Sequence, residues 1–370
     1  MQLPNSSTLP INALAACFNS TSATYKFYWF LAILQEVEKG NARPLKKDLF
    51  AGMIANAWYT VNYFHVSFGK LDMLQRAIEN IKVIEALCVD DKPGKICHTL
   101  TASANKKTIK ELQYFNQEVP WRFLSPWISP KNEKEVYSSS LGFQNNCPYA
   151  LFENCIEINP SWVPYLVQNA GILKAFCYWK LSLYLQKHNP NVPDIPNKLI
   201  KPPFRNGLAK QRLFWDIVLD ELGYVECIYS RNKLTKGNYA VEHFIPHAFV
   251  SHDLMWNLIP ACKSFNSSKS DKLPPLDIYF ERFYQLQVTG LEIVKSKEPK
   301  NKLLEDYLSI YPNIQSILAD KNLAKQRFKE QLQPLITIAA NNGFEFMRPE
   351  NLTASNKKIA KQLFYVPEMI

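Results

Sequence analysis

A change in the spacing of apolar residues near position 224 constrains the fold more than any other feature of this sequence. Before it, apolar residues recur mainly at spacings of three and four, the pattern of helices that bury one face. From Tyr224 to Pro274 short β-prone runs alternate with turn formers, and Asn266 to Lys272 has the composition of a helix start. We therefore predict a mainly α fold with a small α+β module of two strands, a loop and a helix.

The length of 370 residues exceeds the usual size of one domain. The stretch 189–203 is interpreted as a linker or extended connection because it holds five prolines: Pro190, Pro193, Pro196, Pro202 and Pro203. We expect three parts, namely a helical N-terminal domain over residues 1–200, the α+β module over 201–290 and a C-terminal helical segment over 291–370.

Helices are expected where the apolar spacing is clearest. In the first two hundred residues the predicted helices are Tyr25–Glu38, Asp48–His65, Leu71–Leu87 and Trp162–Gln186. Further along, the predicted helices are Leu208–Leu222, Lys302–Tyr311 and Asp320–Asn341, the first of them ended by Gly223 in a left-handed conformation. The stretch 120–160, rich in Pro, Ser and Asn, is interpreted as irregular loops. The aromatic residues on the first two helices are interpreted as core, with a base-stacking platform as the less favoured alternative.

The net charge and the cysteines of the chain indicate what kind of partner it binds and in which cellular compartment it resides. The formal net charge of +10 favours polyanion partners, because neutralising phosphates releases counterions, although many basic proteins bind no nucleic acid. The 8 cysteines follow no disulfide-like rhythm, and no signal peptide is evident. The longest apolar run, Phe27–Leu34, is too short to span a bilayer. We expect a cytoplasmic protein with reduced thiols and no membrane partner. Without a GxxxxGK[ST] or GxGxxG motif, a nucleotide-driven motor is not expected.

The candidate catalytic residues lie in three short motifs, VEHFIP from Val241, WNLIP from Trp256 and NSSKSD from Asn266. Two strands, a loop and a helix would bring residues 242, 243 and 266 into one site, provided that the strand ends near His243, as Pro246 indicates. A neutral imidazole is a suitable base for activating water near neutral pH. Carboxylate and amide oxygens suit Mg²⁺. Such a set is the minimum for cleaving a phosphodiester.

With fourteen residues from His243 to Asn257 and nine from there to Asn266, the three motifs resemble the HNH nuclease family of the ββα-metal fold. The resemblance implies that His243 is the general base and that Glu242 and Asn266 are ligands of Mg²⁺, with Mn²⁺ as a substitute. It implies that Asn257 is the structural asparagine, which holds the backbone of the histidine loop and so completes the catalytic set. The third position carries Asn, as in the HNH domain of CRISPR effector nucleases.

The sequence departs from the family at the cysteines. Many HNH proteins carry two CxxC pairs that bind a structural zinc, whereas here the corresponding stretches are CIYS from Cys227 and CKSF from Cys262. Two thiolates do not complete a tetrahedral zinc site. We therefore expect no structural zinc, with Phe265 and its neighbours packing in its place. Ligation by His247 or His252 is the less favoured alternative.

Several neighbouring side chains allow two interpretations. Lys269 is one turn from Asn266, so we expect it to contact a phosphate of the nucleic acid, and a solvated lysine is the alternative. His247 and His252 are interpreted as loop residues near the DNA backbone. Asp253 is interpreted as a turn former, with a partner of the histidine as the second choice.

The resemblance implies a metal-dependent endonuclease that hydrolyses DNA, by nicking or by a double-strand break. A large helical N-terminal part for targeting or sensing fits bacterial anti-phage or restriction-type defence, together with other defence-system proteins. RNA such as transfer RNA is the alternative substrate. A nucleic-acid-binding subunit of a defence complex is the alternative class, which the intact set of Glu242, His243, Asn257 and Asn266 argues against.

Overall fold

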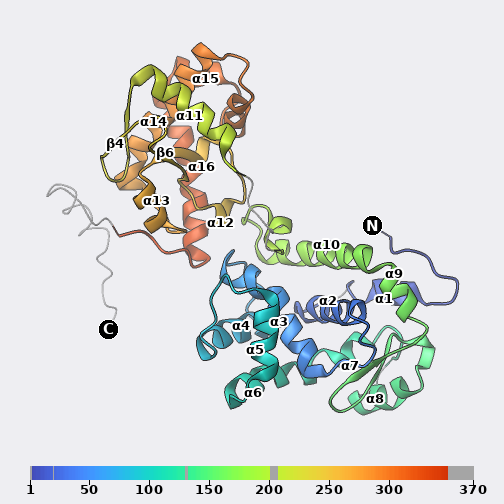
Figure 1. Ribbon diagram of the computed structural model, residues 1–370. Helices are drawn as coiled ribbons and strands as arrows, with labels where there is room; N and C mark the ends of the chain where they lie inside the picture. Colours follow the sequence, from blue (N-terminus) through green and yellow to red (C-terminus); the bar gives the residue numbers. More distant parts are fainter. Residues whose placement is uncertain (1, 20, 130–131, 201–206, 349–370) are drawn as a thin grey trace, which may run out of the picture. The chain divides into compact units, whose positions relative to one another are not determined.

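The computed structural model describes residues 2–19, 21–129, 132–200 and 207–348 (Figure 1). The chain divides into two compact units, Met1–Pro202 and Pro203–Ile370. The division falls within the proline-rich stretch that the sequence marks as a connection, of which the part after residue 200 lies outside the described residues. No helix in the described parts of the chain has the length and apolarity needed to cross a lipid bilayer.

The first unit consists of helices and one small hairpin. Its α-helices are α1 (Ile11–Ala16), α2 (Tyr25–Glu38), α3 (Lys46–Asn62), α4 (Met73–Ile84), α5 (Pro93–Ala102), α6 (Lys106–Tyr114), α7 (Pro120–Phe123), α8 (Glu133–Leu141), α9 (Val163–Gln168) and α10 (Ala170–His188). The 3₁₀ helices described there are η1 (Phe115–Gln117), η2 (Gln144–Asn146) and η3 (Ile195–Lys198). Strands β1 (Tyr149–Leu151) and β2 (Ile156–Ile158) pair antiparallel.

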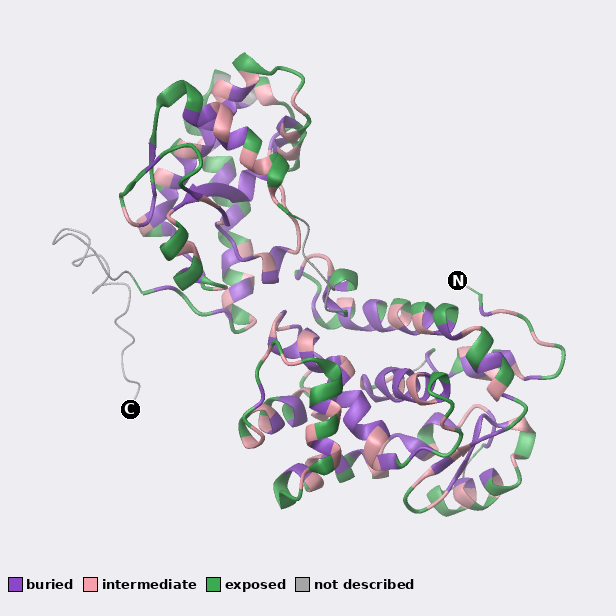
Figure 2. Cartoon of the chain, in the orientation of Figure 1, coloured by how far each residue is buried: buried purple, intermediate pink, exposed green. Residues whose placement is uncertain are grey.

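Helix α2 lies at the centre of the core of the first unit. Every side chain from Phe27 to Leu34 is buried, as Figure 2 shows by colour. Helix α3 packs closely along α2. The absence of a side chain at Gly52 permits this approach, since an added Cβ there would lie 3.1 Å from Cβ of Ala32. The indole of Trp29 donates a hydrogen bond to the hydroxyl of Tyr149 at 3.0 Å. The prediction that the aromatic residues form core is confirmed for α2 and for Trp58 of α3, whereas Tyr59 and Tyr63 are partly exposed.

The sequence locates the long helices of this unit better than the short elements. Three predicted helices correspond to α2, α3 and α4, and the fourth is divided into α9 and α10 at Asn169. The interpretation of residues 120–160 as irregular loops is wrong in part. Helix α8 lies there, capped by the Asn132 side chain, which accepts from the backbone N–H of Glu135, and the β1–β2 hairpin follows. Elements this short contain too few residues to show a period.

The second unit contains the predicted α+β module and further helices. Its α-helices are α11 (Ala209–Leu222), α12 (His247–Val250), α13 (Lys263–Lys269), α14 (Leu276–Lys297), α15 (Ile314–Ala319) and α16 (Lys321–Asn341). The 3₁₀ helices described there are η4 (Met255–Asn257) and η5 (Lys302–Ser309). Two antiparallel pairs form, β3 (Val225–Glu226) with β4 (Lys233–Leu234) and β5 (Ala240–His243) with β6 (Leu258–Ala261). The prediction of a mainly α chain with a small α+β module is confirmed.

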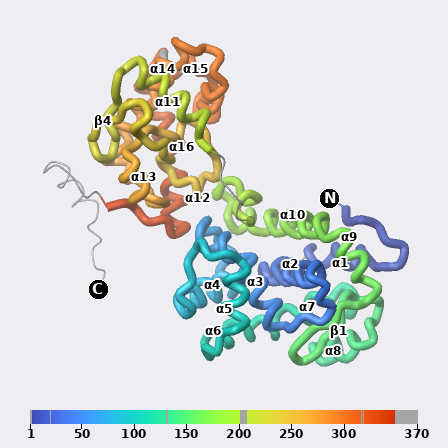
Figure 3. The backbone as a smooth tube through the Cα atoms, in the orientation of Figure 1, coloured from blue at the N-terminus to red at the C-terminus, as the bar shows by residue number. Residues whose placement is uncertain are grey.

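Two long helices hold strand β6 from outside the module. Helices α11 and α14 both contact β6, which is labelled next to them in Figure 1, and Figure 3 traces the backbone of the two helices side by side. The buried indole of Trp215 in α11 donates to the carbonyl oxygen of Leu258 at 3.2 Å. The amide of Gln287 in α14 donates to the same oxygen at 2.8 Å and to that of Met255 at 3.2 Å. Gly290 allows the two helices to approach, since an added Cβ would lie 3.0 Å from the Trp215 ring.

The C-terminal helices pack on the same α14. The ring of Phe328 in α16 stacks on that of Phe283 with centroids 5.6 Å apart. The hydroxyl of Tyr284 donates to the carbonyl oxygen of Lys321 at 2.8 Å. Helix α14 continues across residue 290, where the sequence suggested a boundary, so the module and the C-terminal helices share one core. At the other end of the module, Gly223 follows α11 with the expected positive φ of 76°, but its ψ of -39° lies outside the predicted left-handed helical region.

Candidate active site

Strand β5 places Glu242 and His243 at adjacent positions with different environments. In the register with β6, Glu242 lies opposite Ile259 and His243 opposite Leu258. Successive side chains of a strand point to opposite faces, and here Glu242 is 3% exposed while His243 remains partly exposed. The strand ends at His243, and Pro246 precedes α12. The pair therefore offers one buried carboxylate and one imidazole accessible from solvent.

Asn257 fixes the loop that follows His243. Its side chain is fully buried, and its amide oxygen accepts from the backbone N–H of Ile245 at 2.8 Å. Its amide nitrogen donates to the carbonyl oxygen of Ile245, also at 2.8 Å. The backbone N–H of Phe244 donates to the carbonyl oxygen of Asn257 at 2.8 Å. These three bonds hold the backbone immediately after His243 in one position.

The imidazole of His243 has a carboxylate partner. Its Nε2 lies 2.8 Å from Oδ1 of Asp253, which belongs to the loop between α12 and η4. The hydrogen bond with His243 lowers the pKa of the Asp253 carboxyl and outweighs the opposing effect of burial. The interpretation of Asp253 as a turn former is therefore wrong. A carboxylate in this position orients the imidazole ring.

Lys269 forms a buried ion pair with Glu242. Its ammonium lies 2.6 Å from Oε1 of Glu242 and donates to the carbonyl oxygen of His243 at 2.9 Å, and neither charged side chain is more than 3% exposed. The second oxygen of the carboxylate accepts from the hydroxyl of Tyr229 at 3.0 Å. The alternative of a solvated lysine is wrong. In this structure the ammonium is directed at Glu242, and its predicted contact with a phosphate stays a prediction.

Asn266 lies on α13, one turn before Lys269, and is partly exposed. Within the described chain its side chain forms no hydrogen bond with another residue. The structure thus brings the ammonium of Lys269 against the Glu242 carboxylate and the backbone carbonyl of His243, and it leaves the amide of Asn266 free to accept a ligand.

The donor set fits a hard cation only in part. Among the residues that the structure describes, no group of three or more His, Cys, Asp or Glu side chains could hold a metal ion. One carboxylate and one amide are oxygen donors of the kind that Mg²⁺ takes together with water and substrate oxygens. However, the carboxylate of Glu242 already faces an ammonium.

An aromatic pair occupies the region of the missing cysteines. The rings of Tyr229 and Phe265 stack with centroids 4.5 Å apart and an interplanar angle of 10°. Cys227 is buried, and the sulfur of Cys262 lies 3.7 Å from both the hydroxyl of Ser264 and the amide of Asn232. The expected packing of Phe265 is thus present. The stack connects the loop after β3 to α13.

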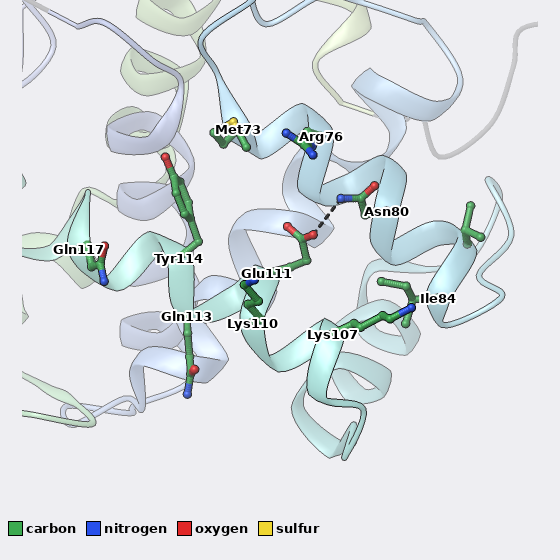
Figure 4. Close-up of a pocket in the computed structure, with 11 residues that line it drawn as sticks. Met73, Arg76, Asn80, Ile84, Lys107, Lys110, Glu111, Gln113, Tyr114 and Gln117 are labelled. Atoms are coloured by element: carbon green, nitrogen blue, oxygen red, sulfur yellow. Dashed lines mark hydrogen bonds between the residues drawn. The ribbon is translucent and has the colours of Figure 1, made fainter.

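A groove of about 860 Å³ lies in the first unit between α4 and α6. Figure 4 shows both helices contributing side chains to it, with the hydrogen bond from Asn80 to Glu111 drawn across. Its lining residues are Met73, Arg76, Asn80, Val83, Ile84, Lys107, Lys110, Glu111, Gln113, Tyr114 and Gln117. None of the predicted site residues lines this groove, and nothing in the helical periodicity of the sequence singled it out.

Comparison with known proteins connects this geometry to one family. Residues 224–275 match the family model described as HNH endonuclease. No curated protein and no solved structure matches the chain significantly. The matched range runs from the start of β3 to the segment after α13 and contains every predicted site residue. Residues 224–275, with the order β5, β6 and α13, are therefore similar to an HNH endonuclease module.

Proposed function

We propose that this protein is a metal-dependent endonuclease that hydrolyses DNA, with His243 as the general base. The observation that supports this best is the contact between His243 and Asp253 beside the buried Glu242. With Nε2 held by Asp253, Nδ1 is the nitrogen left to take a proton from water. The water oxygen then attacks phosphorus, the bond to the 3′-oxygen breaks, and the leaving 3′-oxygen takes a proton from solvent, so that products with 5′-phosphate and 3′-hydroxyl ends result.

Glu242 and Asn266 are the residues proposed to hold Mg²⁺ or Mn²⁺. When bound, the metal would neutralise charge on the phosphate and on the leaving oxygen. The side chains of this chain supply the remaining functions. Asn257 fixes the backbone that aims His243, and Asp253 stabilises the imidazolium that forms when the proton arrives.

We assign the helical first unit a role in holding the nucleic acid. Of the net charge of +10, residues 1–202 account for +6, from 21 Lys and Arg against 15 Asp and Glu. Around the α4–α6 groove, Arg76, Lys107 and Lys110 are exposed cations suited to phosphates. Tyr114, 39% exposed, offers a ring on which a base can stack.

A role in bacterial anti-phage or restriction-type defence, carried out in the cytoplasm, belongs to the same proposal. Its support is the joining of an HNH module, residues 224–275, to a separate helical unit, residues 1–202. The test compares phage plating on bacteria that express the wild type or His243→Ala. Fewer plaques with the wild type alone are expected, and equal plating over a broad set of phages would contradict the defence role.

The nuclease activity is tested with supercoiled plasmid and labelled RNA, incubated in parallel with Mg²⁺, Mn²⁺ or EDTA. We expect nicked or linear plasmid with either metal and intact plasmid with EDTA or with His243→Ala. Cleavage of RNA alone would change the substrate and keep the site. If the protein binds either polymer but cleaves neither in any metal, the proposed nuclease activity is contradicted and a nucleic-acid-binding subunit is favoured.

A further inference from the structure

Lys269 is a buried cation at the carboxylate that the proposed function assigns to the metal. Its side chain is 0% exposed, and its ammonium contacts Oε1 of Glu242 and the carbonyl oxygen of His243. Tyr229 donates to the other carboxylate oxygen. Both carboxylate oxygens of Glu242 thus already have a hydrogen-bond donor, Lys269 for one and Tyr229 for the other.

The location of this pair has an energetic reason. A buried carboxylate is costly unless a cation and hydrogen-bond donors face it, and the same holds for a buried ammonium. Lys269 lies at the C-terminal end of α13, so its contact with Glu242 also fastens α13 to β5. The pair therefore stabilises the arrangement of the site without any metal.

A divalent cation at Glu242 would meet the ammonium of Lys269 at close range. Two positive charges a few ångströms apart in a region shielded from water repel strongly. If Oε1 of Glu242 accepted a divalent ion while keeping its contact with Lys269, the repulsion between the two cations would weaken binding of the metal.

We propose that Lys269 is the resident counter-cation of Glu242 and that binding of the metal displaces its ammonium. This inference rests on the proposed function in so far as Glu242 is the metal ligand. Lys269 then lowers the metal affinity of the site and keeps α13 in place until the metal arrives. Displacement also frees the ammonium for the phosphate contact predicted from the sequence, so that metal loading and substrate contact are coupled.

The first test is a titration of the full chain with Mn²⁺ at about pH 8 without nucleic acid, following free Mn²⁺ by electron paramagnetic resonance. The variants are Lys269→Met and, as a matched control, Lys272→Met, which removes an exposed lysine three residues further on. We expect Lys269→Met to bind Mn²⁺ about 10- to 100-fold more tightly than the wild type, since the repulsion is gone. Lys272→Met should bind like the wild type. Equal or weaker binding by Lys269→Met would overturn the inference.

The second test uses the wild-type chain, so it does not depend on the folding of a variant. Lysines are labelled briefly with acetic anhydride, with and without Mn²⁺, and the modified sites are quantified by mass spectrometry. Labelling of Lys269 should rise several-fold when the metal is added, whereas Lys272 should not change. Unchanged protection of Lys269 at saturating Mn²⁺ would contradict displacement.

A third variant separates this inference from the proposed function. Glu242→Ala should lose Mn²⁺ binding if the metal site is assigned correctly. Binding that needs Glu242 but is indifferent to Lys269 overturns the inference alone. Binding that does not need Glu242, or no binding by the wild type and by Lys269→Met, overturns the assignment of the metal site as well.

Discussion

Nε2 of His243 and Oδ1 of Asp253 lie 2.8 Å apart, although the two residues are ten positions apart in the sequence. Replacing Asp253 by Asn keeps the size of the side chain and removes its charge. Carboxylates that orient a functional histidine commonly contribute about 10- to 100-fold, and we expect a fall of that size in the cleavage rate of Asp253→Asn. Single-turnover cleavage of plasmid checks it, with DNA binding measured alongside. A wild-type rate in Asp253→Asn would show that the contact has no part in the reaction.

The same hydrogen bond predicts how stability depends on pH. It lowers the pKa of Asp253 in the folded protein, so the carboxylate stabilises the fold at pH values above the ordinary range near about 3.9. That contribution is lost as the pH falls through the lowered pKa. The difference in Tm between wild type and Asp253→Asn should therefore be largest near neutral pH and shrink towards about pH 3. Thermal unfolding followed by circular dichroism measures it, and a difference that grows on acidification would contradict the prediction.

Asn257→Ala removes two buried hydrogen bonds to the backbone of Ile245. The N–H and C=O left without partners should lower the free energy of unfolding by about 2–4 kcal/mol. The cleavage rate should fall because the loop after His243 is no longer fixed. Denaturant unfolding provides the measurement, and Asn238→Ala, at an exposed position of the same module, provides the control. Equal stability of the two variants would argue against a structural role.

The stack of Tyr229 on Phe265 predicts a fold that survives chelation. Phe265→Ala should destabilise the second unit by about 1–3 kcal/mol, because it removes apolar burial and about 1 kcal/mol of ring stacking. Prolonged treatment of the wild type with a strong chelator should leave its Tm unchanged, and elemental analysis should find no stoichiometric zinc. One zinc per chain, with unfolding upon its removal, would show that Cys227 and Cys262 still belong to a metal site.

Charge reversal in the α4–α6 groove tests the role assigned to the first unit. In a His243→Ala background, reversal of Arg76, Lys107 and Lys110 to Glu should weaken DNA binding by about tenfold or more. The slope of log affinity against log salt should fall by about 1 for each phosphate that the variant no longer neutralises. The matched control reverses three exposed lysines of the same unit that do not line the groove: Lys70, Lys134 and Lys187. If both triple variants lose the same affinity, the net charge of the unit, and not the α4–α6 groove, accounts for DNA binding.

The sequence located the module because its residues are constrained locally. Glu242, His243, Asn257 and Asn266 lie in short motifs with set spacings, and strand, turn and helix formers surround them. The partners of these residues were harder to find. Asp253 meets His243 only because the loop through α12 turns back, and loop residues have no period. The ion pair of Lys269 depends on how α13 packs on β5, which no one-dimensional pattern contains.

The two donors to the carbonyl oxygen of Leu258 come from Trp215 and Gln287, and both residues lie outside the range that matches the family. A fragment cut at residues 224 and 275 would therefore lack an indole, an amide and both helices that cover β6. A minimal version of the module should therefore include both residues that donate to the carbonyl oxygen of Leu258. The shortest piece expected to fold around His243 runs at least from Ala209 to Lys297, that is, from the start of α11 to the end of α14.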